Sequence, residues 1–165
     1  MHPACLPPSE LARQCDELRT RRGGPGGQHR NKVETAVVLI HRPTGIRAEA
    51  AERRSQAENR AMALRRLRLK LALEHREPAG DEVSDTWRRR VRGRTLVVSA
   101  GHADLPALIA EALDRLSAAG WHVPPAALKL GVSNSQLAGL LRKAPTAWTA
   151  FNTFRVQAGL PALGS

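Results

Sequence analysis

A glycine-dense stretch near the N-terminus limits what this chain can fold into. Residues 23–27 read Gly-Gly-Pro-Gly-Gly, and four glycines with one proline in five positions cannot hold a helix or a strand. The sequence therefore predicts a loop over residues 22–32. The loop separates a short strand expected at residues 17–21 from a β-branched, apolar run at residues 35–41.

The residues on either side of this loop predict regular elements. Residues 35–41 (TAVVLIH) and 46–50 (IRAEA) flank the turn sequence Arg42-Pro-Thr-Gly45, a pattern typical of a β-hairpin. Upstream, Ser9 is a candidate N-cap for a short helix over residues 9–17. The loop is therefore expected to connect neighbouring strands of a small sheet.

A long helix is expected after the hairpin. Ser55 can cap its start, and Glu58 completes a capping box three residues later, so we expect the helix to run to about His75. Its apolar residues fall into two sets: Leu64, Leu67 and Leu71 on one face, extended backward by Ala57 and Ala61, and Leu69 and Leu73 on the other side. Arg65, Arg66 and Lys70 occupy the remaining surface.

The second half of the chain predicts a helical module. Residues 77–85 form a polar connector, residues 87–94 (WRRRVRGR) a basic patch, and residues 95–99 an added strand. Helices are expected at 105–118, 125–130, 135–142 and 145–158. The expected fold class is α+β: a small mixed β-sheet with a long packing helix in residues 1–100, followed by a helix-turn-helix-like module in residues 101–165.

Residues 125–142 carry the helix-turn-helix pattern. Ala127 is the small residue at the helix crossing, Gly131 lies in the turn, and Leu130, Val132, Leu137 and Leu140 have the expected core spacing. The second helix would present Asn134, Ser135, Gln136, Arg142 and Lys143, with Trp148, Phe151 and Phe154 as further core residues. Since this region has almost no net charge, a packing or docking module is favoured over a DNA reader.

The charge of the chain is concentrated in one region. The 165 residues carry 26 Lys+Arg and 15 Asp+Glu, a net charge of +11. Between Arg19 and Arg94 there are 20 Lys+Arg and 9 Asp+Glu, whereas the two flanks together carry six of each. A localised excess favours a surface that binds a polyanion, with a solvated Arg-rich face as the alternative.

Several classes of protein are excluded by composition. No apolar run approaches the roughly 18 residues of a membrane helix, and the N-terminus does not read as a secretory signal, so we expect a cytoplasmic protein. Cys5 and Cys15 are too few for a disulfide framework. His41, His75, His102 and His122 are isolated, which favours structural or solvent-facing roles over metal binding.

Gln28 stands at the tip of the glycine-rich loop. Its neutral amide cannot act as a strong general base, but it can orient a water molecule or donate to a developing oxyanion. His29, Arg30 and Lys32 follow directly and would hold the loop against phosphates. Taken alone, a glycine-rich loop is also typical of a plain flexible connector.

The whole segment resembles the catalytic domain of the class I peptide-chain release factors. The hallmark tripeptide of that family is Gly26-Gly27-Gln28 here, beside His29-Arg30-Asn31-Lys32, and the resemblance continues through Thr35–Val37, Pro43–Ile46 and Glu52–Ala61. Some 55–60 residues match in order. This extent is far more specific than a tripeptide.

The resemblance implies hydrolysis of the ester between nascent peptide and P-site tRNA on the ribosome. The backbone amide of Gln28 would stabilise the leaving 3′ oxygen, its side chain would place water, and Gly26 and Gly27 would permit the geometry. No cofactor or metal is implied, and a glutamine methyltransferase is a further expected partner because the family glutamine is often N-methylated. The implied RNA contacts are Arg22, His29, Arg30, Asn31, Lys32, Arg53, Arg54, Gln56, Asn59 and Arg60.

The chain departs from its relatives at both ends. About 20 residues precede the loop, too few for a stop-codon-reading domain, so we expect a monomeric, codon-independent factor that rescues stalled ribosomes. The basic C-terminal tail of known rescue factors is absent after Arg155. Two alternatives remain open: a ribosome- or nucleic-acid-binding regulator targeted by the helix-turn-helix, and decoding through a partner protein.

Overall fold

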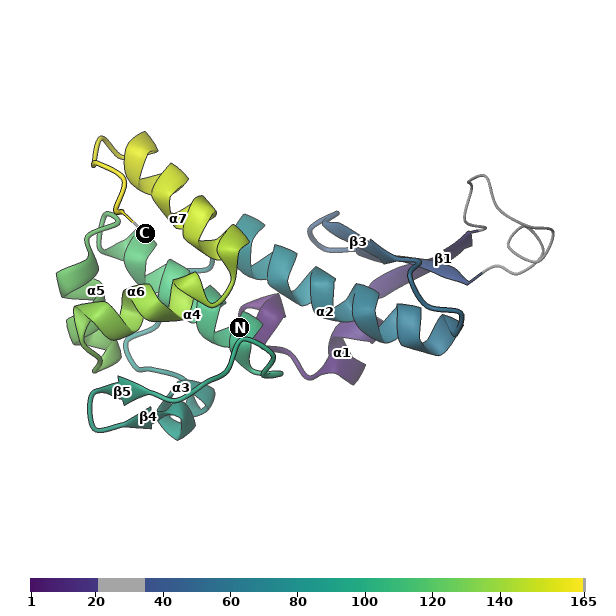
Figure 1. The fold of residues 1–165 in the computed structure, drawn as a ribbon, viewed down its shortest axis with the longest axis horizontal. Coiled ribbons are helices and arrows are strands. Elements are labelled where there is room, and N and C mark those ends of the chain that lie inside the picture. The colour runs from purple at the N-terminus through teal and green to yellow at the C-terminus, as the bar shows by residue number, and fades with distance from the viewer. Residues whose placement is uncertain (21–34, 165) are drawn as a thin grey trace.

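Figure 1 shows the computed structural model, which describes residues 1–20 and 35–164. In chain order the elements are η1 (Pro3–Cys5), α1 (Pro8–Arg13), β1 (Cys15–Thr20), β2 (Ala36–His41), β3 (Arg47–Ala50), α2 (Gln56–Glu74), α3 (Asp85–Arg90), β4 (Val91–Arg92), β5 (Thr95–Leu96), α4 (Leu105–Ala118), α5 (Val123–Leu130), α6 (Asn134–Arg142) and α7 (Pro145–Gln157). The α+β class is confirmed, and the described sheets are antiparallel rather than mixed.

The three-stranded sheet has the order β1-β2-β3. Its register pairs Cys15 with His41 at one end and Thr20 with Ala36 at the other. The predicted hairpin is confirmed, and Gly45 adopts a φ of +72° in its turn, a conformation that glycine reaches without strain. The first helix ends at Arg13 instead of residue 17, because the chain has to enter the sheet at Cys15.

Helix α2 covers one face of this sheet, and Ser55 caps it by accepting from the Glu58 N–H at 3.3 Å. The predicted burial of Leu64, Leu67 and Leu71 is confirmed, with Leu69 and Leu73 partly buried. The predicted extension through Ala57 and Ala61 is wrong, since both are exposed. The buried face continues through Ala63 and Asn59, which lie four and eight residues before Leu67 and so share its face.

Residues 85–96 form a helix and a small hairpin of their own. Only Thr95–Leu96 of the predicted strand 95–99 is extended, and it pairs with Val91–Arg92 instead of joining the main sheet. Trp87 does not belong to a surface patch: it is buried, and its indole Nε1 donates to the Leu130 carbonyl at 2.8 Å. The tryptophan thus anchors α3 to the end of α5.

The four C-terminal helices lie close to their predicted ranges, and Gly131 ends α5 with a φ of +67°. Of the predicted aromatic core, Phe151 is buried, whereas Trp148 and Phe154 are only half-buried. Helix α4 packs on α2 and η1, and buried residues of both halves form one hydrophobic cluster. The division into two domains at residue 100 stays a prediction. The hydrophobic cluster contains residues from both sides of that position. None of the described helices combines the length and apolar character needed to cross a bilayer.

Candidate nucleic-acid interface

The predicted site residues fall into two groups. Gly26, Gly27 and Gln28, together with Arg22, His29, Arg30, Asn31 and Lys32, lie outside the described residues. The others lie at or just before the start of α2. Thr20 pairs with Ala36 at the end of the sheet, and the Thr35 carbonyl is bonded to Asn59 in the first turn of α2, so both residues that flank the segment 21–34 lie beside the start of this helix. The described structure therefore shows the base on which the predicted catalytic segment is mounted.

Asn59 ties three backbone segments together at this base. Its side-chain Nδ2 donates to the carbonyls of Thr35 at 2.6 Å and Arg53 at 2.9 Å, and its Oδ1 accepts from the Arg53 N–H at 2.9 Å. The side chain is fully buried. It thus links the first described residue after the segment 21–34 to α2 and to the loop before α2.

The expectation that Asn59 contacts RNA is corrected by this geometry. A fully buried amide whose donors and acceptor already serve the backbone has no atom to offer a phosphate. The sequence contains a signal for this role, because Asn59 is spaced by four and eight residues from Ala63 and Leu67 on the buried face of α2. Buried polar groups are kept in native structures because they are hydrogen-bonded.

Arg60 is exposed but already paired with a carboxylate. Its Nε donates to Glu17 Oε2 at 2.7 Å, and Arg19 approaches the other Glu17 oxygen at 3.4 Å. The hydrogen bond from Arg60 lowers the pKa of Glu17 below its usual value. Glu17 on β1 was missing from the predicted site, and it partly neutralises Arg60 as a phosphate ligand.

Arg53 and Arg54 are the freest predicted cations at this end. Both are exposed, and their guanidinium groups form no ion pair or hydrogen bond with the described residues. Gln56 is half-buried, and its Nε2 is buried with no hydrogen-bond partner within the described part of the chain. Arg53 and Arg54 are therefore the strongest described candidates for phosphate contact.

The cations further along α2 serve the fold instead. Arg66 donates to the Glu49 carbonyl at 2.8 Å and pairs with Glu52 at 2.5 Å, and Lys70 donates to the Arg47 carbonyl at 3.1 Å. The hydrogen bond from Arg66 lowers the pKa of Glu52 to about 2. These side chains fasten α2 to β3, which sequence patterning alone did not predict.

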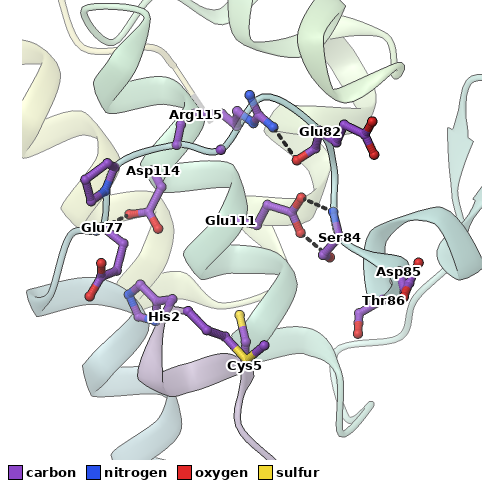
Figure 2. A pocket seen from close by; sticks show the side chains of 14 residues that line it. His2, Cys5, Glu77, Glu82, Ser84, Asp85, Thr86, Glu111, Asp114 and Arg115 are labelled. Carbon is purple, nitrogen blue, oxygen red and sulfur yellow. Dashed lines mark hydrogen bonds between the residues drawn. The ribbon is translucent and has the colours of Figure 1, made fainter.

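A cavity of about 440 Å³ near the N-terminus is an unsuitable alternative site (Figure 2). Carboxylates line it, among them Glu111, which accepts from the backbone N–H and the hydroxyl of Ser84 at 2.8 and 2.5 Å. Burial raises the pKa of the Cys5 thiol to about 11, so the thiol stays protonated at neutral pH and is a poor nucleophile. An acidic lining repels phosphates.

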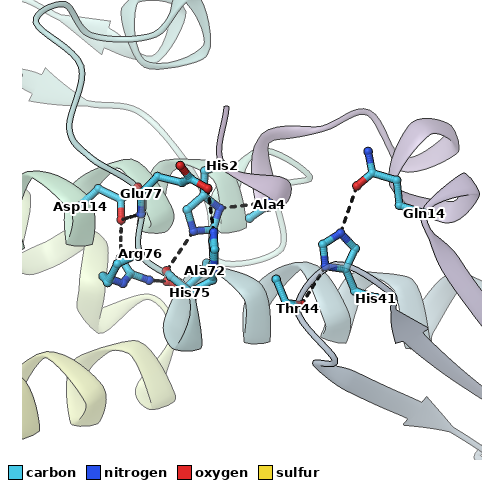
Figure 3. Close-up of polar contacts among 10 residues, drawn as sticks. All are labelled: His2, Ala4, Gln14, His41, Thr44, Ala72, His75, Arg76, Glu77 and Asp114. Carbon is cyan, nitrogen blue, oxygen red and sulfur yellow. Dashed lines mark hydrogen bonds and ion pairs between the residues drawn. The ribbon is translucent and has the colours of Figure 1, made fainter.

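Three described histidines hold the fold together (Figure 3). The His41 ring contacts Thr44 Oγ1 at 2.8 Å and Gln14 Oε1 at 3.1 Å, and His75 contacts Glu77 at 2.7 Å. His2 lies against the His75 carbonyl at 3.1 Å, and burial lowers its pKa to about 4. His41 and His75 have the structural roles that the sequence predicted. Across residues 1–20 and 35–164, no three His, Cys, Asp or Glu side chains gather as metal ligands.

The helix-turn-helix presents only part of the predicted recognition surface. Asn134 and Ser135 are exposed, but Gln136 turns toward the small hairpin and accepts from the Leu96 N–H at 3.0 Å. Arg142 stacks on the ring of Trp148, with 4.1 Å from its guanidinium carbon to the ring centroid. Gln136 thus fastens α6 to β5, and the choice between a packing module and a DNA reader stays a prediction.

These features define the class of protein: a small α+β domain in which a helix with exposed cations supports the base of a glycine-rich segment. The RF-1 domain model matches residues 12–99, more than half of the chain, and the chain belongs to this family. The match includes the Gly26-Gly27-Gln28 tripeptide and helix α2, and it ends before the helical module.

Curated relatives extend this similarity. The chain is 46% identical over 81 residues to the chloroplastic peptide chain release factor PrfB1 of Arabidopsis thaliana, covering 44% of this chain and 18% of that protein. It is 46% identical over 71 residues to peptide chain release factor 1 of Symbiobacterium thermophilum, covering 43% and 20%. It is 41% identical over 83 residues to peptide chain release factor 2 of Petrotoga mobilis, covering 50% and 21%. The matched part spans about a fifth of each relative.

Proposed function

We propose that this chain catalyses peptide release: ribosome-dependent hydrolysis of the ester that joins a nascent peptide to P-site tRNA. The observation that carries the proposal is the RF-1 domain match over residues 12–99, which encloses Gly26-Gly27-Gln28. Release factors are also what the similar curated proteins are named. The proposed partners are ribosomal RNA and peptidyl-tRNA.

Gln28 acts on the reacting ester in this proposal. Its backbone N–H donates to the leaving 3′ oxygen as negative charge develops there, and its side-chain amide positions the attacking water. Gly26 and Gly27 allow the backbone to present that N–H. The ribosome supplies the substrate and its surroundings, so the chain contributes no covalent nucleophile.

The described residues supply the support for this chemistry. Asn59 fixes the carbonyl of Thr35, next to the segment that carries Gln28, against α2. Arg53 and Arg54 are exposed just before the start of α2 and bind RNA phosphates in our proposal. A one-ångström error in placement reduces catalysis strongly, so a clamp at the base of the segment has a direct catalytic value.

We further propose that release is independent of a stop codon and rescues stalled ribosomes. The factor then acts in the cytoplasm as a monomer, and a methyltransferase that modifies Gln28 is a proposed partner. The observation that supports a role other than DNA reading for the helical module is the hydrogen bond from the Leu96 N–H to Gln136, which takes up one of the predicted recognition side chains.

A peptide-release assay tests both levels of this proposal. Ribosomes carrying labelled peptidyl-tRNA in the P site are prepared with an empty A site, with a sense codon and with a stop codon. We expect release from all complexes at similar rates, and a requirement for the stop codon would overturn codon independence alone. If the purified chain binds free DNA tightly, binds ribosomes poorly and releases no peptide, the regulator alternative replaces the proposal.

A further inference from the structure

A second candidate site lies where the RF-1 domain meets the helical module. A groove of about 420 Å³ is bounded by α2, the start of α4 and the turn between α6 and α7. In Figure 1 the first turn of α7 lies close to α2. The α2 residues of the groove fall inside the family match, and those from Ala100 onward fall outside it. The RF-1 domain and the helical module therefore both contribute residues to the groove, and it forms only when they pack together.

The floor of the groove is apolar. Its apolar lining comes from Met62 and Leu69 of α2, Leu105 and Pro106 of α4, and Pro145 of α7. The groove is open to solvent instead of forming a closed void. A flat apolar group can therefore enter it while the rest of the same molecule stays outside.

The rim of the groove carries cations, and no Asp or Glu lines it. The Lys143 ammonium has no ion-pair or hydrogen-bond partner within residues 1–20 and 35–164. Arg65 is exposed and donates only to the Gly101 carbonyl at 3.1 Å, whereas Arg66 is neutralised by Glu52. His102 adds a half-exposed ring.

A carboxylate just outside the lining does not neutralise the positive charge at the rim of the groove. Asp104 lies 3.8 Å from His102, but its carboxylate is paired with Arg90 at 2.8 Å. Helices α4 and α7 both begin at the groove, and the positive ends of their dipoles add to the attraction for an anion. The net field in the groove therefore favours a negatively charged group.

The apolar lining and cationic rim of this groove have the chemistry needed to bind an unpaired nucleotide. The base is planar and stacks on apolar or ring side chains, and the phosphate beside it pairs with Lys or Arg. A volume of about 420 Å³ is within the roughly 300–1,000 Å³ range of small-molecule sites. An open groove also lets a strand continue past the bound nucleotide.

We propose that this groove binds an unpaired nucleotide of single-stranded RNA, with the base on the Met62–Leu105 floor and the phosphate on Lys143 and Arg65. The choice of RNA over other anions rests on the proposed function, which places the chain on the ribosome. The groove gives the helical module a role in docking at a surface that does not include Arg53, Arg54 or Asn59.

The test is an NMR titration of the full ¹⁵N-labelled chain with the dinucleotide pUpU at 150 mM salt. We expect amide shifts at Ala100, Lys143 and Thr146. Lys143→Glu should weaken the affinity derived from these shifts about tenfold. The matched control Lys129→Glu makes the same charge change at an exposed position of the same module outside the groove, and should leave that affinity within about twofold.

A second pair of variants tests the shape of the groove without changing charge. Ala100→Trp places a ring at the exposed rim and should abolish the groove shifts, whereas Ala118→Trp, at an exposed position outside the groove, should preserve them. Both proteins are checked for folding by their amide spectra.

Three results would overturn the proposal. The first is the absence of groove shifts with pUpU in the wild-type chain, and the second is equal binding by Lys143→Glu and Lys129→Glu. The third is an equal response to a tetraglutamate peptide, which would indicate an acidic protein partner. Because the titration contains no ribosome, its failure leaves the release assay unaffected, and a failed release assay leaves the groove measurement intact.

Discussion

Replacing Asn59 by alanine should destabilise the protein and slow peptide release together. The change removes three part-buried hydrogen bonds, to the Thr35 carbonyl and to both backbone groups of Arg53. The Arg53 N–H and two carbonyls lose their partner, and each lost bond costs about 0.5–1.5 kcal/mol net, more where a donor is left unpaired. We expect a total loss of about 2–4 kcal/mol in the free energy of unfolding.

Urea unfolding of the full chain measures this loss. Asn134→Ala is the matched control, because Asn134 is exposed at the start of α6, and it should change the stability by less than about 0.5 kcal/mol. Asn59→Asp sharpens the test: its size is nearly unchanged, but the introduced carboxylate faces two carbonyl oxygens in a buried site. We expect this variant to lose stability as the pH rises above about 4, since the charged form is disfavoured there.

Equal midpoints for Asn59→Ala and Asn134→Ala would refute the reasoning. In that case Asn59 does not clamp the base of the segment 21–34, and its assignment to an RNA contact has to be reconsidered. Normal stability of the Asn59→Ala variant, combined with a large loss of ribosome affinity, would assign Asn59 to an RNA contact.

Three further predictions concern other regions. Replacing Arg53 and Arg54 together by Glu should weaken ribosome binding in a filter-binding assay. The slope of the logarithm of affinity against the logarithm of salt concentration should become shallower by the amount expected for about two lost phosphate contacts. A slope equal to that of the wild-type chain would exclude both residues as RNA contacts. Burial raises the pKa of Asp114 to about 6, so this carboxyl is protonated in the folded state and ionised in the unfolded state between about pH 4 and 6, and its contribution to stability should fall as the pH rises through this window. Asp114→Asn should remove that dependence in urea titrations at several pH values, and an unchanged slope would contradict the assignment. Trp87→Phe loses the hydrogen bond to Leu130 and should cost about 1–3 kcal/mol in thermal unfolding, and an unaltered melting temperature would show that the anchor is unimportant.

Local signals in the sequence predicted much of the fold. The turn at Gly45, the cap at Ser55 and the amphipathic pattern of α4 depend on residues close together in the chain, and all three are found where expected. The conformational needs of a tight turn and the orphan N–H groups of a helix start are the same in any tertiary context. Such elements can therefore be predicted without knowledge of their neighbours.

The parts that were missed depend on contacts between distant segments. Ala57 and Ala61 fit an apolar face, but the sheet covers the face that contains Asn59. Likewise, Arg66 and Gln136 look like free surface residues in the sequence, and both are occupied by backbone groups of other elements. Tertiary packing decides which face of α2 is covered. It also decides which polar side chains are hydrogen-bonded to other elements.

The most direct measurement is the single-turnover rate of peptide release by the Gln28→Pro variant on ribosomes with an empty A site. Proline removes the backbone N–H that the account assigns to the leaving oxygen, so we predict a loss of about two to three orders of magnitude in rate at saturating factor. Gln28→Ala keeps that N–H and should lose less. Release by the Gln28→Pro variant at the wild-type rate would contradict the central claim that this chain hydrolyses peptidyl-tRNA through Gln28.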